Sequence, residues 1–182
     1  MKTNWSRIAR RIRVPLGFAF AIAFLWIAQP SPASLAWSLL LVLPGIALRA
    51  YASGYVKKNR ELTVTGPYAH TRNPLYLGSL SIALGFAVAA RNWWILAGIA
   101  ILFFTIYLPV IRSEEEFLRG MFPGFDDYCG RVPRLFPRIT PGMQGEAGKF
   151  SPALYSRHRE YNAFMGAVAL YAVLLLRLYF RR

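Results

Sequence analysis

The chain has 182 residues, of which 55% are hydrophobic and 16% are charged, and its net charge at pH 7 is +14. Such an apolar composition argues against a soluble domain and favours an integral membrane protein. The basic residues flank the apolar runs and follow no recognition motif, which argues against a nucleic-acid-binding protein. One cysteine, Cys129, excludes an internal disulfide, and the two histidines lie far apart, so no metal site is expected.

The first apolar run has no charged residue from position 14 to 48 and is interrupted once, by "QPSPAS" at 29–34. Its two prolines and two serines end one helix and turn the chain back. We therefore predict helices over about 14–29 and 35–53. The basic start followed by an apolar run imitates a signal peptide, but the turn leads directly into more apolar sequence, so a retained anchor is expected.

The next two predicted helices form a hairpin over about 74–90 and 93–111. Pro74 suits a first helical turn, where its missing N–H costs nothing. Arg91 and Asn92 provide a tight turn, and Trp93 and Trp94 follow where an interfacial aromatic belt is expected. Residues 112–140 then form a cytoplasmic segment that completes a predicted membrane core over 1–140.

The C-terminal part is predicted to consist of a linker over 141–160 and an additional hydrophobic helix within 161–182. Whether this helix crosses the bilayer or lies along its interface stays open, because crossing would carry its terminal arginines against the positive-inside trend. The prediction is thus an all-α, polytopic integral membrane protein with about five transmembrane helices. Its oligomeric state is not predicted.

Loop charge predicts the orientation. The N-terminus and the 54–73 loop are rich in Lys and Arg, whereas the 29–34 turn has neither. The N-terminus, the 54–73 loop and the chain after Arg112 are therefore expected on the cytoplasmic side. Two polar segments then emerge on the same face and could share one site: "RELTVTGPYAHTRNPLY" at 60–76 and "SEEEFLRGMFPGFDDYCGRVPRLFP" at 113–137.

Each feature of these segments also has a plain structural interpretation. Gly66 and Pro67 suit a simple turn, and tyrosines at a membrane surface often serve as interfacial anchors. Arg72 can contact lipid phosphate, and Glu115 can pair with Arg119 one helical turn later on a surface helix. Only the joint arrangement of the two segments indicates a function.

Taken together, the two segments resemble the isoprenylcysteine carboxyl methyltransferase family, to which the phospholipid N-methyltransferases are related. The resemblance covers about residues 35–138. It rests on four elements in order: Gly66-Pro67-Tyr68, Arg72-Asn73-Pro74-Leu75-Tyr76, Glu114-Glu115, and Tyr128 followed by Arg131-Val132-Pro133 and Pro137.

The resemblance implies a cytoplasmic pocket for S-adenosyl-L-methionine and a lipophilic small-molecule substrate that arrives from the membrane lipids. It assigns cofactor binding to Arg60, Glu61, Leu62, Thr63, Tyr68, Asn73, Pro74, Leu75, Tyr76 and Glu114. It assigns catalysis to Arg72, Glu114 and Glu115, and we expect substrate contacts from Arg112, Tyr128 and Arg131. These roles suit the cofactor's chemistry, because a carboxylate can bind its ammonium, an arginine its carboxylate, and tyrosine faces its sulfonium.

Two departures leave the substrate open. The isoprenylcysteine enzymes have His where this chain has Asn73, which cannot carry a proton. They also tend to place an arginine where this chain has Val110, and the nearest arginine is Arg112. Either O-methylation of a carboxylate or N-methylation of an amine is compatible with the sequence, and His70 could serve as a base for an amine.

Two further functions stay open. Membrane reductases of the sterol-reductase type share a related architecture and use NADPH, whose phosphate the basic 57–60 loop could bind, although the glutamates at 114–116 disfavour this. A non-enzymatic membrane scaffold that keeps the same turns is also compatible with the sequence.

Overall fold

The computed structural model describes residues 4–57, 60–143 and 148–180, and within these ranges it contains helices and no strand. The predicted all-helical class is therefore confirmed. The helices are α1 (Asn4–Ile27), α2 (Pro32–Ser53), η1 (Gly66–Ala69), α3 (Pro74–Ala90), α4 (Trp93–Leu102), η2 (Phe103–Tyr107), α5 (Leu108–Met121), α6 (Phe125–Arg131), α7 (Pro152–Arg157) and α8 (Tyr161–Phe180).

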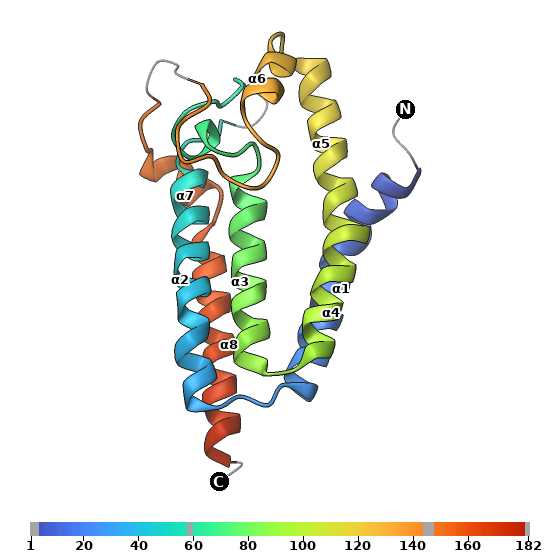
Figure 1. Cartoon of the computed structure of the whole chain (residues 1–182), viewed down its shortest axis with the longest axis vertical. Coiled ribbons are helices and arrows are strands. Elements are labelled where there is room, and N and C mark those ends of the chain that lie inside the picture. The colour runs from blue at the N-terminus through green and yellow to red at the C-terminus, as the bar shows by residue number, and fades with distance from the viewer. Residues whose placement is uncertain (1–3, 58–59, 144–147, 181–182) are drawn as a thin grey trace.

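The long helices stand roughly parallel, and most of the connecting chain gathers at one end (Figure 1). Helices α2, α3 and α8 form one group, and α1 packs with α4, η2 and α5 in the other. We call the connecting chain at 54–73 and 122–157 the cap. Helix α8 runs along α2 and does not lie across the end of the bundle, and the C-terminus is at the end opposite the cap.

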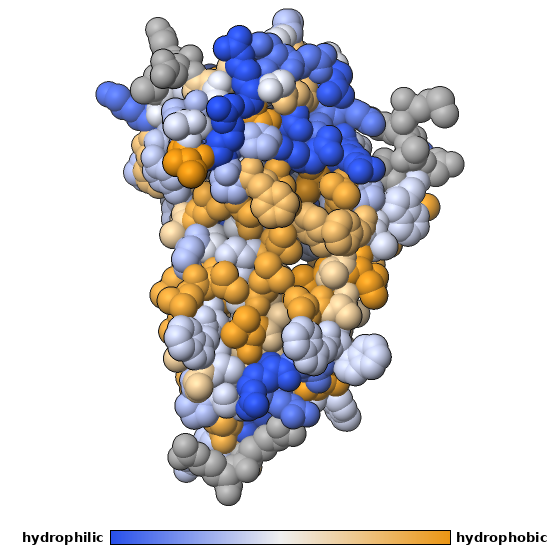
Figure 2. All heavy atoms as spheres, viewed as in Figure 1, coloured by the Kyte–Doolittle hydropathy of each residue, from blue (hydrophilic) through white to orange (hydrophobic). Residues whose placement is uncertain are grey.

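A hydrophobic band crosses the middle of the molecule on the face that Figure 2 shows. Figure 2 shows hydrophilic residues over the cap, hydrophobic residues below it and a smaller hydrophilic group near the opposite end. Trp93 and Trp94 follow the α3–α4 turn at that opposite end and are 83% and 80% exposed, as expected for an interfacial aromatic belt. This distribution is that of an integral membrane protein.

Three helical stretches among the described residues are long and apolar enough to cross a bilayer: Pro32–Ser53, Trp93–Met121 and Tyr161–Phe180. Helix α3 is apolar but shorter. The number of about five transmembrane helices stays a prediction.

Helix boundaries follow local capping. Helix α2 begins at Pro32, slightly before the predicted start, because Ser31 and Ser34 form a reciprocal capping box: each side-chain oxygen accepts from the other residue's backbone N–H, at 3.1 and 3.0 Å. Helix α3 has its predicted bounds. It ends at Arg91, whose φ of 51° reverses the chain, and Asn92 then caps α4 by accepting from the Trp94 N–H at 2.9 Å.

The helix predicted to end near 111 continues to Met121 through a π-helical segment, η2. Pro109 lacks the N–H that would bond to the carbonyl of Thr105 one turn earlier, which disturbs the hydrogen-bond ladder. The free carbonyl of Thr105 instead accepts from the indole N–H of Trp5 at 3.0 Å. This bond fastens α1 to η2. Helix α1 itself begins at Asn4 and not near 14, so the basic N-terminal residues continue the helix beyond the apolar run.

Helices α2 and α3 approach each other closely because glycines face the contact. A Cβ at Gly45 would lie 2.8 Å from the carbonyl oxygen of Gly78, and one at Gly85 would lie 2.9 Å from the carbonyl oxygen of Ser38. Small residues commonly permit such contacts between membrane helices. The close packing fixes the first turn of α3 beside the end of α2, where the candidate site begins.

Candidate functional site

A cavity of about 860 Å³ lies between the cap and the helices. This volume is in the range of small-molecule sites, about 300–1,000 Å³. Its lining comes from α1, the 61–63 segment, the first turn of α3, η2, α5, α6 and Glu160, just before α8. The cap contributes polar side chains, whereas Val14, Gly17 and Phe18 of α1 provide an apolar wall.

The segment that carries the Gly-Pro-Tyr motif has a constrained backbone. Gly66 has a φ of 58°, and a Cβ there would lie 2.6 Å from the ring of Tyr55, so both conformation and space require glycine. The 3-10 helix η1 follows and buries Tyr68. The carbonyl of Tyr68 accepts from the hydroxyl of Tyr128 at 2.7 Å. The first polar segment is thereby fixed to α6.

Further bonds join the two polar segments, although about sixty residues separate them. The backbone N–H of Arg72 donates to the carbonyl of Pro133 at 3.0 Å, and the hydroxyl of Thr71 donates to the carbonyl of Leu135 at 2.9 Å. The N–H of Arg138 donates to the carbonyl of His70 at 3.0 Å. The Arg-Val-Pro segment therefore acts as a brace for the turn that precedes α3.

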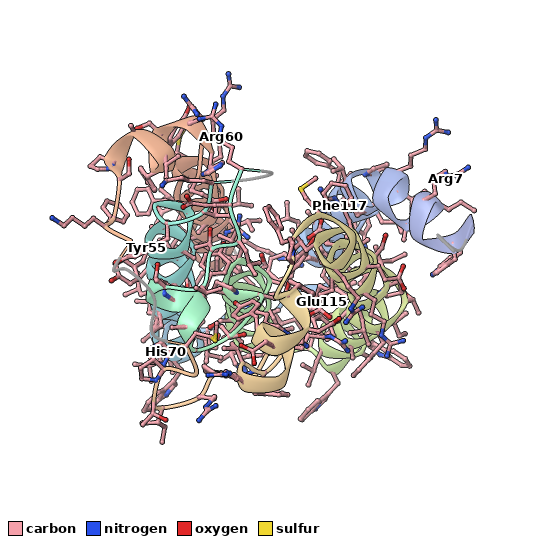
Figure 3. The ribbon with its side chains drawn as sticks, turned by 90° about the horizontal axis from the view of Figure 1, so that it is seen from above. Arg7, Tyr55, Arg60, His70, Glu115 and Phe117 are labelled. Atoms are coloured by element: carbon pink, nitrogen blue, oxygen red, sulfur yellow. The ribbon has the colours of Figure 1, made fainter. Side chains whose placement is uncertain are left out.

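Glu115 is the most heavily bonded carboxylate of the site. Its side chain is 5% exposed and accepts from Arg134 at 2.9 Å and from the amide of Asn73 at 3.1 Å. The guanidinium Nε of Arg72 lies 3.4 Å away, close enough for an ion pair. Seen from above the cap, Glu115 lies centrally between α5 and the neighbouring elements (Figure 3). These contacts make Glu115 a link between α5, the α3 turn and the cap.

Glu114 has a different environment. Its carboxylate accepts from the hydroxyl of Tyr76 at 3.0 Å and lines the cavity. The same hydroxyl lies 3.5 Å from a guanidinium nitrogen of Arg13, and the ring of Tyr76 meets that of Tyr107 edge to face. Among the described side chains, no Lys or Arg forms an ion pair with Glu114. The cavity therefore contains a carboxylate that can still bind a cation.

Two buried polar atoms on the cavity wall lack a hydrogen-bond partner among the described residues: Oγ1 of Thr63 and Nε of Arg72. Arg72 is ion-paired with Glu115 at 3.4 Å, but the geometry does not make a hydrogen bond. Buried polar groups are rarely left unpaired in proteins, so such atoms indicate where a polar ligand would bind. Nε of Arg72 could donate to an anionic group, and the Thr63 hydroxyl could donate or accept, so this wall suits a polar small molecule.

Burial raises the pKa of two tyrosines in the cap. Desolvation raises the pKa of the Tyr68 phenol above its ordinary value, and the carboxylate of Glu160 adds to the shift. Desolvation likewise raises the pKa of Tyr128. The Tyr128 phenol therefore keeps, even at alkaline pH, the proton that it donates to the carbonyl of Tyr68.

Most of the residues assigned to the site from the sequence line this one cavity. They are Glu61, Leu62, Thr63, Tyr68, Arg72, Asn73, Pro74, Leu75, Tyr76, Glu114, Glu115 and Tyr128.

Three assigned residues lie elsewhere. Arg60 lines a separate, smaller pocket, and Arg112 is exposed on α5. Arg131 is exposed and pairs with Asp127 at 3.0 Å. The cofactor-binding and substrate-binding roles proposed for them have no support from the cavity lining.

Two interactions expected from the sequence differ in the structure. Arg119 pairs with Asp126 at 2.6 Å and not with Glu115. His70 does not line the cavity, and its Nδ1 lies 2.8 Å from the carbonyl of Arg138. A histidine held in this way at the edge of the cap is poorly placed to act as a base in the cavity.

Sequence reasoning missed Arg13, Arg49, Tyr107 and Glu160, which also line the cavity. The sequence gives one indication that Arg49 is functional: it is a charged residue at the end of an otherwise uncharged run in a predicted membrane helix. Arg49 and Glu160 form a bidentate pair with distances of 2.7 to 3.0 Å. Nothing local to the sequence connects two residues so far apart.

Comparisons with known proteins cover the central half of the chain. The profile of the phospholipid methyltransferase family matches residues 33–124. A nickel-cobalt-cadmium resistance protein of Alcaligenes xylosoxydans xylosoxydans is 40% identical over 90 residues, which are 50% of this chain and 41% of the relative. A cobalt-zinc-cadmium resistance protein of Cupriavidus metallidurans is 39% identical over 90 residues, with the same two shares.

A Delta(14)-sterol reductase of Mus musculus is 32% identical over 83 residues, which are 44% of this chain and 20% of that protein. The chain therefore spans less than half the length of these curated relatives, and no solved structure matches it. The family profile nevertheless covers the hairpin of α3 and α4, the α3 turn and the cavity residues Glu114 and Glu115, in agreement with the resemblance seen in the sequence. The chain belongs to the phospholipid methyltransferase family.

Proposed function

We propose that this protein is a membrane methyltransferase that transfers a methyl group from S-adenosylmethionine to a lipophilic substrate. The single observation that carries the proposal is the Glu114 carboxylate, which faces the cavity, is oriented by Tyr76 and has no ionic partner among the described side chains. Family membership supports the same reaction class.

The residues of the cavity suit the cofactor in a specific way. Glu114 would accept a charge-assisted hydrogen bond from its ammonium group, and Arg72 would donate to its carboxylate. The hydroxyl of Thr63 provides a further buried polar contact. The cofactor, when bound, supplies a methyl group on a positively charged sulfur, and the ring of Tyr76 or Tyr68 would offer that cation a favourable face.

Glu115 is better described as a positioning residue than as a catalytic one. Its carboxylate accepts hydrogen bonds from Arg134 and Asn73 and lies within ion-pair distance of Arg72, so it has less capacity for a substrate than Glu114 has. By holding the turn before α3 against α5, it fixes the distance between Tyr76 and Glu114. Rigid placement of this kind supplies much of the rate of a methyl transfer, since the reacting atoms must lie in line.

The substrate is expected to enter from the bilayer beside α1. Val14 and Phe18 line the cavity and are 57% and 71% exposed on a helix within the hydrophobic band. An apolar wall open to lipid suits a hydrocarbon chain. The attacking group could be a carboxylate oxygen, which needs no deprotonation, or an amine nitrogen, which must first lose a proton.

Titration calorimetry with S-adenosylhomocysteine tests the proposal on the purified protein in detergent. Binding is expected for the wild type, and Glu114→Gln should weaken it by about tenfold or more, because a charge-assisted bond becomes a neutral one. Glu116→Gln is the matched control, because Glu116 lies two positions after Glu114 on α5, is exposed and does not line the cavity. Equal affinity in the wild type and both variants would contradict the assignment of Glu114.

A reductase is the second candidate, and the similarity to the mouse sterol reductase is the observation that favours it. The same titration with NADPH separates the two enzymes. If the protein binds NADPH but not S-adenosylhomocysteine, a reductase is the better assignment. If it binds neither, a non-enzymatic scaffold is favoured. Transfer of a labelled methyl group into membrane lipid extracts would then identify the substrate.

We also propose that the N-terminus and the cap face the cytoplasm. The exposed arginines Arg7 and Arg11 and the basic residues of the cap lie at one end of the molecule, as the positive-inside rule requires. Reporter fusions at Gly142 and at the C-terminus should give opposite orientations, because α8 separates these two points.

A further inference from the structure

A second pocket, of about 310 Å³, lies at the cap end of α2 and is separate from the site described above. Its polar lining consists of Lys57, Arg60, Lys149, Ser151, Arg157 and His158, and it contains no carboxylate among the described residues. Lys57 is balanced by Glu61 at 3.0 Å. The other three permanent cations, Arg60, Lys149 and Arg157, have no ion-pair partner in the described part of the chain.

Two segments distant in sequence build this pocket. The N–H of Ser151 donates to the carbonyl of Gly54 at 2.9 Å, and the ring of Phe150 stacks on Tyr51 at 6.1 Å. The Nδ1 of His158 lies 3.0 Å from the carbonyl of Ser53, an acceptor only, so Nδ1 must carry the proton of that bond. These contacts hold α7 and the chain before it against the end of α2.

The partial negative charge at the C-terminal end of α2 accounts for the presence of His158 in the pocket. It does not account for the three permanent cations beside it. His158 bonds directly to the last turn of that helix, as a residue that complements the helix dipole would. Arg60, Lys149 and Arg157 are exposed and have no ion-pair partner in the described part of the chain. Solvent screens their mutual repulsion, so it costs little free energy, but together they give the pocket a positive potential that would attract an anion.

The types and number of the basic residues favour a phosphate group over a single carboxylate. Two guanidinium groups, from Arg60 and Arg157, can each donate two parallel bonds to phosphate oxygens, and Lys149 adds a point charge. Val56 and Leu154 complete the lining with apolar surface. The pocket lies at the cap end of α2, where the candidate span Pro32–Ser53 ends, and the end of a span is the level of lipid headgroups in a bilayer.

We propose that this pocket binds a phosphate group, supplied either by an anionic lipid headgroup or by free phosphate. The site does not depend on the methyltransferase activity: it shares only Val56 with the large cavity, and none of its charged residues lines that cavity.

Binding is measured on the purified full chain in detergent with two probes: short-chain phosphatidylglycerol and inorganic phosphate, at constant ionic strength. The Arg60→Gln/Arg157→Gln variant should bind the responsive probe at least tenfold more weakly than the wild type, since each charge-assisted bond is worth about a factor of ten. The matched control is Arg7→Gln/Arg11→Gln, which removes the same charge from exposed positions on α1. Figure 3 shows Arg7 on the opposite side of the molecule from Arg60.

The outcomes are distinct. If only Arg60→Gln/Arg157→Gln loses phosphatidylglycerol binding, and the wild type does not bind inorganic phosphate, the site is supported and its phosphate group comes from a lipid. Loss of binding for both probes in that variant alone supports a site for free phosphate. Equal losses of binding in both double variants, or no loss in either, would refute a specific phosphate site in this pocket. Any binding would then be due to the general positive charge of the surface.

Discussion

The pair of Arg49 and Glu160 links the C-terminal helix to the candidate site, and we expect its removal to weaken the whole fold. Three donor–acceptor distances of 2.7 to 3.0 Å join the guanidinium and the carboxylate, which are 22% and 11% exposed. The same guanidinium also donates to the carbonyl of Leu75, at 3.2 Å, and to the hydroxyl of Ser79. Glu160→Gln leaves a cation in place without its counter-charge.

Removing one partner of a buried pair costs about 3–5 kcal/mol. Arg49 keeps two neutral acceptors and some contact with solvent, so the lower end of that range, about 3 kcal/mol, is the expected loss in the free energy of unfolding. For a chain of this length, each kcal/mol lowers the melting temperature by about 2–4 °C. A decrease of about 6–12 °C is therefore expected for Glu160→Gln.

Thermal melting followed by circular dichroism at 222 nm in detergent provides the measurement. Glu116→Gln serves as the control, because it removes a carboxylate from an exposed position. The double variant Arg49→Met/Glu160→Leu should recover part of the loss, since an apolar pair leaves no buried charge. A melting temperature of Glu160→Gln equal to that of the control would show that the C-terminal helix is not fastened through this pair.

Three further variants test other parts of the structure by the same melting assay. Glu115→Gln removes the counter-charge of two arginines and should cost about 3 kcal/mol, with weaker binding of S-adenosylhomocysteine as the turn before α3 loosens. Gly85→Leu should cost about 1–3 kcal/mol by forcing α3 away from α2, whereas Gly166→Leu, where a Cβ would meet nothing within 4 Å, should cost nothing. Because burial raises the pKa of Tyr128, its phenol stays protonated in the folded protein while the unfolded chain ionises above about pH 10, so the free energy of unfolding should fall as pH rises beyond that point. Tyr128→Phe should lose about 1 kcal/mol at pH 7, with its bond to Tyr68, and should show a shallower alkaline decline; an unchanged slope would refute this account.

The fold was predictable where local chemistry determines it. Prolines and serines at 29–34 and the pair at 91–92 mark turns, and the apolar runs between them have the length of membrane helices. The predicted helix boundaries are wrong where contacts between residues far apart in the sequence determine the structure. The helix that begins at Trp93 continues past 111 to Met121 and contains a π-helical segment, in which the carbonyl of Thr105 accepts from Trp5, one hundred residues earlier in the chain. No local pattern contains that bond.

The residues of the candidate site also fall into those that the sequence could predict and those that it could not. Residues within the two polar motifs, such as Tyr76 and Glu114, could be placed together because orientation brings both segments to one face. Arg60 belongs to the first motif by sequence, yet the chain turns it toward the second pocket. Glu160 was missed because it reaches the cavity through its pairing with Arg49, and pairing over such a separation depends on how α8 packs along α2.

The family profile ends at residue 124 and begins at 33, so part of the cavity wall comes from sequence outside the family match. Arg13 and Phe18 on α1 and Glu160 before α8 are the clearest examples. The matched part contributes Tyr76 and Glu114, the groups proposed to hold the cofactor. On the proposed function, substrate selection would reside in the apolar wall of α1 and in the chain that leads into α8. Replacing Val14 and Phe18, while Arg13 and its bond to Tyr76 are kept, should therefore change which lipid is methylated and leave the affinity for S-adenosylhomocysteine the same.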